Sequence, residues 1–198
     1  MTLIANTTSR LKSPKTYSLA EYLAKEEQSI HKHEFYNGQI IRMPGSKYKH
    51  NKICSNVIHF LTVGIDTLVQ HYEVLTSDQK IYIPAENVSL YSDALVISEK
   101  PVFWENREDL LLNPLVIVEV ASKGTRGYDR GEKFMLYKNI PSFKEYVLIE
   151  QDKHSVETWF RQDAETWKVN TVEGIDAVVS LRSIEVSLAL KDIYKHLV

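Results

Sequence analysis

A glutamate inside an apolar run is the first residue of this chain whose position calls for chemistry. Glu119 lies in the segment LVIVEVAS, between Val118 and Val120. The flanking residues are typical of a strand that is buried on both faces, where an unpaired carboxylate is costly. The compensating partner could be a lysine, a metal ion or a proton, and each partner implies a different function.

A second acid, Asp93, begins the strand-like segment SDALVI. Side chains alternate faces along a strand, so each acid has a defined side. If the two strands are antiparallel neighbours and their connection is centred on Asn106, Asp93 and Glu119 lie thirteen residues either side of that centre. The carboxylates then face each other as a cross-strand pair, with Cβ atoms about 5 Å apart.

Two carboxylates at such a separation repel each other. Either one of them holds a proton at a raised pKa, or both bind a cation. A pair of oxygen ligands, with water in the remaining coordination positions, suits Mg²⁺ or Mn²⁺. We therefore expect Mg²⁺, or alternatively Mn²⁺, as the cofactor.

A cationic side chain is expected beside the acids, and the segment after Glu119 offers four: Lys123, Arg126, Arg130 and Lys133. Asp129 and Glu132 predict a helix that begins at Asp129, with Lys133 in its first turn. There the helix dipole favours an anion such as phosphate, and we interpret Arg126 and Arg130 as phosphate-binding residues. Two acids, a divalent cation and a lysine together indicate metal-assisted hydrolysis of phosphodiesters.

The elements that must position these residues follow from periodicity and turn chemistry. Ser18 and Glu21 form a capping box, which predicts a short helix to about Gln28. The segment HEFYNGQIIRM predicts a hairpin with its turn at Asn37-Gly38. Apolar residues at three- and four-residue spacing then predict an amphipathic helix over 46–70.

The rest of the chain favours strands. YEVLTSDQKIYIP indicates a strand or a strand pair, YSDALVIS and KEYVLIE each indicate a strand, and residues 99–114 form a long connection. VETWFR and WKVNTV predict a hairpin, and one more strand and a short terminal helix follow. The sum is an α+β fold whose mixed central sheet is flanked by helices, with the Glu119 strand at its centre.

Composition narrows the class of protein. The 198 residues suit one domain over 17–198, preceded by a flexible tail over 1–16. The net charge of −2 argues against a strongly basic nucleic-acid coat, although it permits a local basic groove. The single cysteine, Cys54, allows no intrachain disulfide and favours a cytoplasmic location. No apolar stretch approaches the roughly 20 residues that span a bilayer, so we expect no membrane partner.

The order of these segments resembles a family. The early hairpin, the long helix, SDALVI, LVIVEV, YDRGEK and IPSFKEYVLIE follow one another as in a large bacterial family of restriction-endonuclease-like proteins of the PD-(D/E)XK nuclease superfamily. The resemblance runs from about Tyr17 to about Val172. It implies a restriction-endonuclease-like core with extra N- and C-terminal hairpins, and a metal-dependent nuclease whose partner is nucleic acid, with DNA expected first.

The resemblance also implies roles for individual residues. Asp93 and Glu119 take the places of the two acids of the superfamily motif and would be metal ligands, and the carbonyl of Val120 would complete the inner shell. Glu34 matches the acid of the early hairpin, where it could hold a second metal or position water. His50 matches a histidine near the start of the long helix and could contact phosphate or assist proton transfer.

This sequence departs from the superfamily pattern at two positions. Ser92 stands where a proline often precedes the first acid, and Ala121 stands where the superfamily places its lysine. In the family the lysine comes instead from the YDRGxK segment, so the resemblance assigns the role of the superfamily lysine to Lys133. Cleavage therefore requires that Lys133 reach back to Glu119.

Two other readings compete with the nuclease. Ala121 and the near-neutral charge favour a non-catalytic module that retains the nuclease fold and binds nucleic acid or another partner. Glu119 and Lys133 could also form a purely structural ion pair. Cys54, Tyr128 and Tyr137 are interpreted as packing residues. A homodimer is expected if both strands of a duplex are cut, because two sites are then needed.

Overall fold

The structure is a computed structural model that describes residues 15–197. Most of the expected N-terminal tail, residues 1–16, therefore lies outside the described residues. Five α-helices and one π-helical turn are present in the described part: α1 (Leu19–Glu26), α2 (Tyr48–Ile65), α3 (Arg126–Tyr128), η1 (Asp129–Lys133), α4 (Phe134–Tyr137) and α5 (Leu190–Ile193). None of these helices is long and apolar enough to cross a membrane.

The strands of the same part fall into an earlier and a later group. The earlier strands are β1 (His33–Tyr36), β2 (Gln39–Arg42), β3 (Tyr72–Thr76), β4 (Lys80–Ile83), β5 (Val88–Tyr91), β6 (Ala94–Ser98), β7 (Phe103–Trp104) and β8 (Arg107–Leu111). The later strands are β9 (Val116–Ala121), β10 (Glu145–Glu150), β11 (Ser155–Arg161), β12 (Trp167–Glu173), β13 (Val178–Leu181) and β14 (Val186–Ala189).

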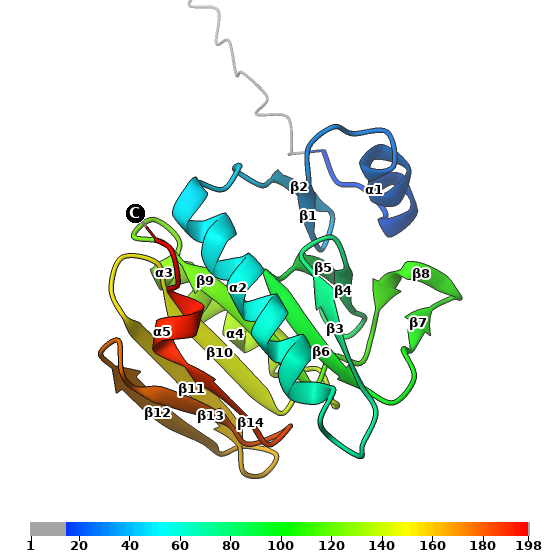
Figure 1. Ribbon diagram of the computed structural model, residues 1–198. Coiled ribbons are helices and arrows are strands. Elements are labelled where there is room, and N and C mark those ends of the chain that lie inside the picture. The colour runs from blue at the N-terminus through cyan, green and yellow to red at the C-terminus, as the bar shows by residue number, and fades with distance from the viewer. Residues whose placement is uncertain (1–14, 198) are drawn as a thin grey trace, which may run out of the picture.

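The fold is mixed α+β, as expected, but it has two large sheets in place of one (Figure 1). The first sheet has the strand order β2-β1-β5-β4-β8-β7 and the second has the order β12-β11-β10-β9-β6-β3. Strands β13 and β14 form a separate hairpin. Strand β9 lies inside the second sheet, parallel to β10 and antiparallel to β6, which is the central place expected for it.

The chain changes sheets where the sequence predicted one continuous strand. Strand β5 ends at Tyr91 in the first sheet, and β6 begins at Ala94 in the second. The expected strand over YSDALVIS is therefore wrong in its first part, because Ser92 and Asp93 form the crossing. As a result, Asp93 lies at the junction of the two sheets and belongs to neither strand.

The expected pairing of the Asp93 and Glu119 strands is confirmed. Strands β6 and β9 are antiparallel, with Ala94 opposite Val118, so the next position places Asp93 opposite Glu119. The connection between them is not a loop, however. It forms β7 and β8, and β8 pairs with β4 of the first sheet.

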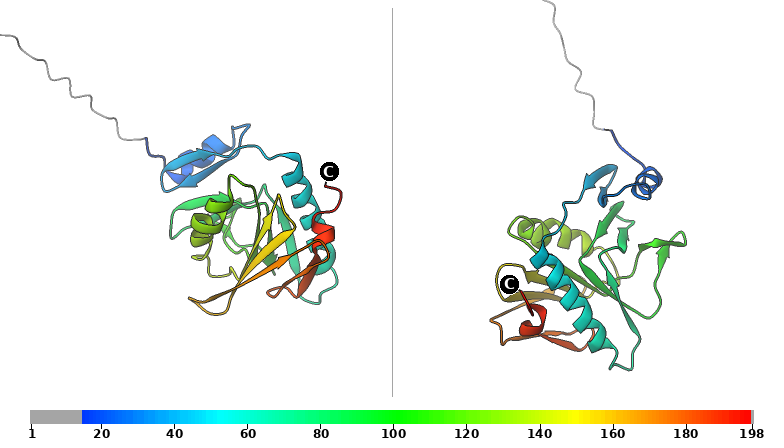
Figure 2. Two further views of the ribbon diagram at one scale, coloured as in Figure 1. Left: turned by 90° about the vertical axis from the view of Figure 1, so that its left-hand side faces the viewer. Right: turned by 45° about the horizontal axis from the view of Figure 1, so that its top comes forward.

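The second sheet is covered on both faces. On one face Val96, Val118 and Val147 pack against α2, α5 and the β13–β14 hairpin. On the other face Leu95 and Ile117 pack against the first sheet and α4. Figure 2 shows α2 and α4 on opposite sides of this sheet. Removal of these apolar side chains from water is the main force that holds the layers together.

The helix after β9 begins earlier than predicted. Asp129 does not cap it, because its backbone N–H already donates to Thr125 O, and the first helical residue is Arg126. Lys133 ends the π-helical turn η1 and lies in the middle of the helical segment. The predicted contribution of a helix N-terminus at Lys133 is therefore wrong.

Other boundaries also shift. Helix α2 covers 48–65 and not 46–70, and the C-terminal segment contains two strands before α5 and not one. The early hairpin is confirmed, with Asn37 and Gly38 at positive φ as its turn requires. The β11–β12 hairpin and the capping box of α1 are confirmed as well.

Candidate active site

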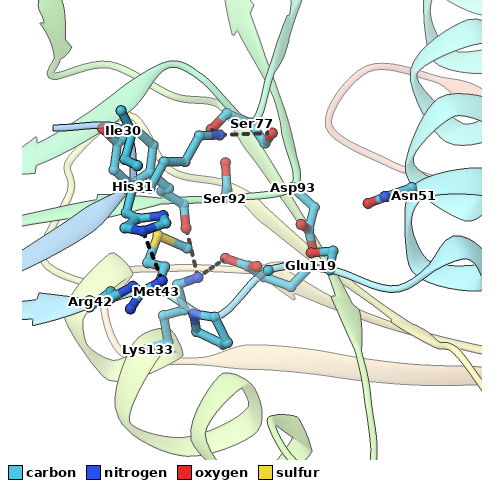
Figure 3. A pocket seen from close by; sticks show the side chains of 15 residues that line it. Ile30, His31, Arg42, Met43, Asn51, Ser77, Ser92, Asp93, Glu119 and Lys133 are labelled. Atoms are coloured by element: carbon cyan, nitrogen blue, oxygen red, sulfur yellow. Dashed lines mark hydrogen bonds and ion pairs between the residues drawn. The ribbon is translucent and has the colours of Figure 1, made fainter.

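A polar cavity of about 480 Å³ lies at the junction of the two sheets, and Asp93, Glu119 and Lys133 line it. Figure 3 shows these three side chains together, with Arg42 on one side of the cavity and Asn51 of α2 on the other. The chain thus brings together one acid from the sheet crossing, one acid from β9 and the lysine of η1.

Glu119 is 4% exposed, and its Oε1 is held by two donors. Lys133 Nζ lies 2.8 Å from this oxygen, and the Tyr137 hydroxyl donates to it at 3.0 Å. Burial raises the pKa of Glu119 well above its usual range, against the attraction of Lys133 and with a further contribution from Asp93. The carboxyl group therefore binds a proton readily when no other cation is near.

Lys133 is as buried as its partner and has three neighbours. Its Nζ donates to Tyr91 O at 2.7 Å and lies 3.6 Å from Glu34 Oε1, in addition to the contact with Glu119. Burial alone would lower the pKa of Lys133, but the carboxylates of Glu119 and Glu34 outweigh it and raise that pKa. The ammonium group therefore keeps its charge.

Asp93 is held by one oxygen only. Its Oδ2 accepts from the Val120 N–H at 2.7 Å and lies 3.2 Å from His50 Nε2. Within residues 15–197 no protein group donates to Asp93 Oδ1 or to Glu119 Oε2. In Figure 3 Asp93 lies beside Glu119, whose carboxylate points toward Lys133. Each acid thus has one oxygen held by the protein and one available to a ligand.

The carbonyl of Val120 lies on the edge of β9 that faces this space. Val118 O accepts from Asp93 N, whereas Ala121 O accepts from Gln151 N on the opposite edge. Because successive residues of a strand direct their carbonyls to opposite edges, Val120 O points to the Asp93 side, where β6 has not yet begun. Two carboxylate oxygens and a carbonyl are hard oxygen donors, and they fit Mg²⁺ or Mn²⁺.

Glu34, on β1, lies behind Lys133 and does not line the cavity. Its Oε1 accepts from Tyr91 N at 3.3 Å, and its Oε2 accepts from the hydroxyls of Tyr36 and Tyr128 at 2.7 and 3.5 Å. Both oxygens are therefore occupied by protein donors. The side chain joins the first sheet to the helix that carries Lys133.

His50 lies on α2 between Asp93 and Cys54. Its Nδ1 is 3.4 Å from Cys54 Sγ, and its Nε2 faces Asp93. Burial lowers the pKa of His50, but the hydrogen bond and the charge of Asp93 outweigh it, so the net shift is upward. The imidazole is thus an ion-pair partner of Asp93.

Arg126 and Arg130 do not join this cluster. Arg126 pairs with Glu150, and Arg130 pairs with Glu157. Neither arginine lines the cavity. Their role as phosphate-binding residues stays a prediction, and it requires each guanidinium to exchange a carboxylate for a phosphate.

Sequence reasoning assigned Tyr137 and Cys54 to packing, and the structure places both beside site residues. Tyr137 follows Lys133 by four positions and donates to the same oxygen of Glu119. Cys54 follows His50 by four positions on α2. Four-residue spacing on a helix was therefore the available signal, since it places side chains on one face.

The two mixed sheets, with an aspartate, a glutamate and a lysine at their junction, define a restriction-endonuclease-like fold. The chain belongs to the Uma2 family, described as "Putative restriction endonuclease", which matches residues 19–191. This match confirms the resemblance drawn from the order of the sequence segments.

The chain is also similar to a solved structure and to two relatives. The crystal structure of "a putative nuclease belonging to DUF820" from Anabaena variabilis has a TM-score of 0.69 at 18% identity, covering 90% of this chain and 97% of that chain. At this identity the likeness shows the fold alone. Two uncharacterized proteins of Synechocystis sp. are 33% and 30% identical, over 87% and 89% of this chain and 96% and 90% of their own lengths.

Proposed function

We propose that this protein is a divalent-metal-dependent nuclease that hydrolyses phosphodiester bonds of nucleic acid, and that its nucleic acid substrate is DNA. One observation carries the proposal: Asp93 and Glu119 line one cavity and each has a carboxylate oxygen without a protein donor, while Lys133 holds the other oxygen of Glu119. Membership of a family described as a restriction endonuclease supports it.

The residues that would hold Mg²⁺ or Mn²⁺ are Asp93, Glu119 and the carbonyl of Val120. When bound, such an ion lowers the pKa of a coordinated water and neutralises charge on the phosphate. Burial raises the pKa of Glu119, so a divalent cation would take the place of a proton on this carboxyl group.

Lys133 supplies the fixed positive charge of the proposed site. Its ammonium group would stabilise the negative charge that develops on the phosphate, or orient the attacking water. Ala121 stands where the superfamily places its lysine. Lys133 comes from the helix instead, and its Nζ lies 2.8 Å from Glu119 Oε1. Glu34 would act as a positioning residue, because it contacts Lys133 and not the cavity.

Three further residues have proposed roles near the phosphate. His50 would be a proton carrier or a phosphate contact, and its charge is balanced by Asp93 when no substrate is bound. Arg126 and Arg130 would become phosphate contacts if nucleic acid displaced Glu150 and Glu157. A homodimer with two such sites would cut both strands of a duplex.

The first test is cleavage. Plasmid DNA, single-stranded DNA and RNA are incubated with the protein in the presence of Mg²⁺, Mn²⁺ or EDTA. Glu119→Gln removes a charge at constant shape and should slow cleavage by about a hundredfold or more. Glu132→Gln is the matched control, since Glu132 is an exposed acid beside Lys133. Equal loss in both variants, or full activity in Glu119→Gln, contradicts the assignment.

Calorimetry separates the nuclease from a non-catalytic binding module, which Ala121 and the net charge of −2 favour. The nuclease requires Mn²⁺ binding in the wild type that Asp93→Asn abolishes. A module without a metal would bind nucleic acid in a gel shift with and without Mn²⁺ and would cleave nothing. No Mn²⁺ binding at millimolar concentration would mean that Glu119 is paired with Lys133 or protonated.

A further inference from the structure

Helix α2 presents a histidine and a cysteine to Asp93. His50 and Cys54 are four residues apart, so they share one face of the helix. His50 Nδ1 lies 3.4 Å from Cys54 Sγ. In a tetrahedral zinc site the nitrogen and sulfur ligands are about 3.5 Å apart, as bond lengths near 2.0 and 2.3 Å require.

Asp93 completes a triangle of ligand atoms. One ligand atom from each of His50, Cys54 and Asp93, with a single imidazole nitrogen among them, lies within 4.8 Å of the others. Among residues 15–197, His50, Cys54 and Asp93 form a group of three potential ligand side chains that are close enough to hold one ion. All three side chains are partly buried, which favours retention of a bound ion.

The chemistry of the donors separates this group from the oxygen site beside it. A thiolate and an imidazole prefer Zn²⁺, Co²⁺ or Cd²⁺, whereas Mg²⁺ prefers oxygen ligands. Both groups include the carboxylate of Asp93. A carboxylate that already binds a zinc-like ion is less able to bind a hard ion on its other side.

We propose that His50, Cys54 and Asp93 form a second metal site, which takes a zinc-like cation and thereby withdraws Asp93 from the oxygen site shared with Glu119. Binding breaks the S–H bond of Cys54, forms a metal–sulfur bond and releases the proton to solvent. The inhibitory part rests on the proposed nuclease function, whereas the binding part does not.

Co²⁺ is the probe for binding, because its bond to a thiolate gives a charge-transfer band in the near ultraviolet. The chain has a single cysteine, so any such band reports Cys54. Metal-free, full-length protein is titrated with Co²⁺ under reducing conditions. We expect the band to saturate at one Co²⁺ per chain, and its absence in the wild type overturns the proposal.

Variants test the ligand set. Cys54→Ser should abolish the band, and His50→Gln should weaken Co²⁺ binding by at least about tenfold. His59→Gln is the matched control, because His59 lies on the same helix and is exposed. A band that is equally strong in His50→Gln and in the wild type overturns the site. Circular dichroism of each variant distinguishes a lost ligand from a lost fold.

Competition tests the shared carboxylate. Saturating Mg²⁺ should weaken Co²⁺ binding, and Zn²⁺ should inhibit Mg²⁺-dependent cleavage in the wild type. Each rate is divided by the rate of the same variant without Zn²⁺, and Cys54→Ser should then need at least about tenfold more Zn²⁺ for half inhibition. Co²⁺ binding that Mg²⁺ leaves unchanged overturns the sharing of Asp93. If no metal supports cleavage, the nuclease proposal fails, while the cobalt band still decides the second site.

Discussion

Lys133 is the residue on which the charge balance of the site depends. It is 4% exposed and contacts Glu119 and Glu34, which are themselves 4% and 6% exposed. A buried ion pair adds little to stability when it is intact, but the loss of one partner leaves a charge without compensation. The two glutamates thus make Lys133 essential for the fold as well as for the proposed chemistry.

Lys133→Met is expected to lower the free energy of unfolding by about 3–5 kcal/mol, because it leaves two buried glutamates without a cation. Urea denaturation at neutral pH measures the change. Adding Glu119→Gln to this variant should recover part of the loss, since an amide is cheaper to bury than a carboxylate. A Lys133→Met variant as stable as the wild type would show that the glutamates are held neutral by protons.

The titration of His50 should depend on Asp93. In the wild type Asp93 raises the pKa of His50 above its usual value of 6.5, although burial opposes this. The charged pair therefore stabilises the fold below pH 6.5, and this contribution disappears as the pH rises through the higher folded-state pKa. In Asp93→Asn burial still lowers the pKa of His50, and only Asn51 and Asp129 still raise it, so the pKa should fall relative to the wild type.

NMR of the imidazole protons measures this shift, and His50→Gln identifies the His50 signal among the seven histidines. His59, which is exposed on the same helix, is the internal reference. An unchanged His50 curve in Asp93→Asn would show that the ion pair does not form in solution.

At the scale of elements, the π-helical turn η1 explains how the helix delivers Lys133. A π-turn adds a residue to one turn of a helix, and such turns are frequent at functional sites. Here it lies between α3 and α4, and it ends at Lys133, one turn before Tyr137. Both side chains then reach the same oxygen of Glu119.

Gly64 allows α2 to approach the β13–β14 hairpin. A Cβ atom at Gly64 would lie 2.6 Å from Val186 Cγ1, and Val186 is buried. Gly64→Ala should therefore destabilise the protein by about 1–3 kcal/mol through overpacking, which exceeds the gain of roughly 1 kcal/mol in helix propensity. Thermal or urea unfolding measures the net effect.

Gly127→Ala is the matched control for this prediction. Gly127 is helical, and a Cβ atom there meets no other atom within 4 Å, so the variant should gain up to about 1 kcal/mol. Val186→Ala should restore much of the stability lost in Gly64→Ala. A stabilised Gly64→Ala variant would mean that the hairpin moves away from α2 without cost.

At the scale of the whole molecule, the candidate site lies where the two sheets meet. Asp93 is on the crossing between the sheets, Glu119 is in the second sheet, and Glu34 reaches Lys133 from the first. A cation between Asp93 and Glu119 would therefore tie the crossing to the second sheet. Metal binding should in consequence stabilise the entire fold.

Mg²⁺ should raise the melting temperature in a concentration-dependent way. Linkage predicts about 2.7 kcal/mol of added stability at a concentration one hundred times Kd. Differential scanning calorimetry with increasing MgCl₂ measures it, with an equal ionic strength of NaCl as the control. Asp93→Asn should lose the effect. A rise that persists in Asp93→Asn would place the ion elsewhere.

Local signals in the sequence were enough for most elements and for the pairing of the two acids. The capping box at Ser18, the turn at Asn37-Gly38 and the apolar spacing of α2 each depend on a few neighbouring residues. The antiparallel register of Asp93 and Glu119 also followed from counting along the chain, because the two residues lie equally far from the middle of the segment that connects their strands.

Long-range contacts settled the rest. One strand became two at Ser92 and Asp93, because β5 and β6 pair with partners in different sheets that lie far apart in the chain. Arg126 and Arg130 turned to Glu150 and Glu157, which follow them by 24 and 27 positions. Lys133 reached Glu119 because a widened helical turn packs against β9. The periodicity of the sequence predicts which face of a helix or strand is buried. Which other element packs against that face depends on the free energy of the whole folded chain.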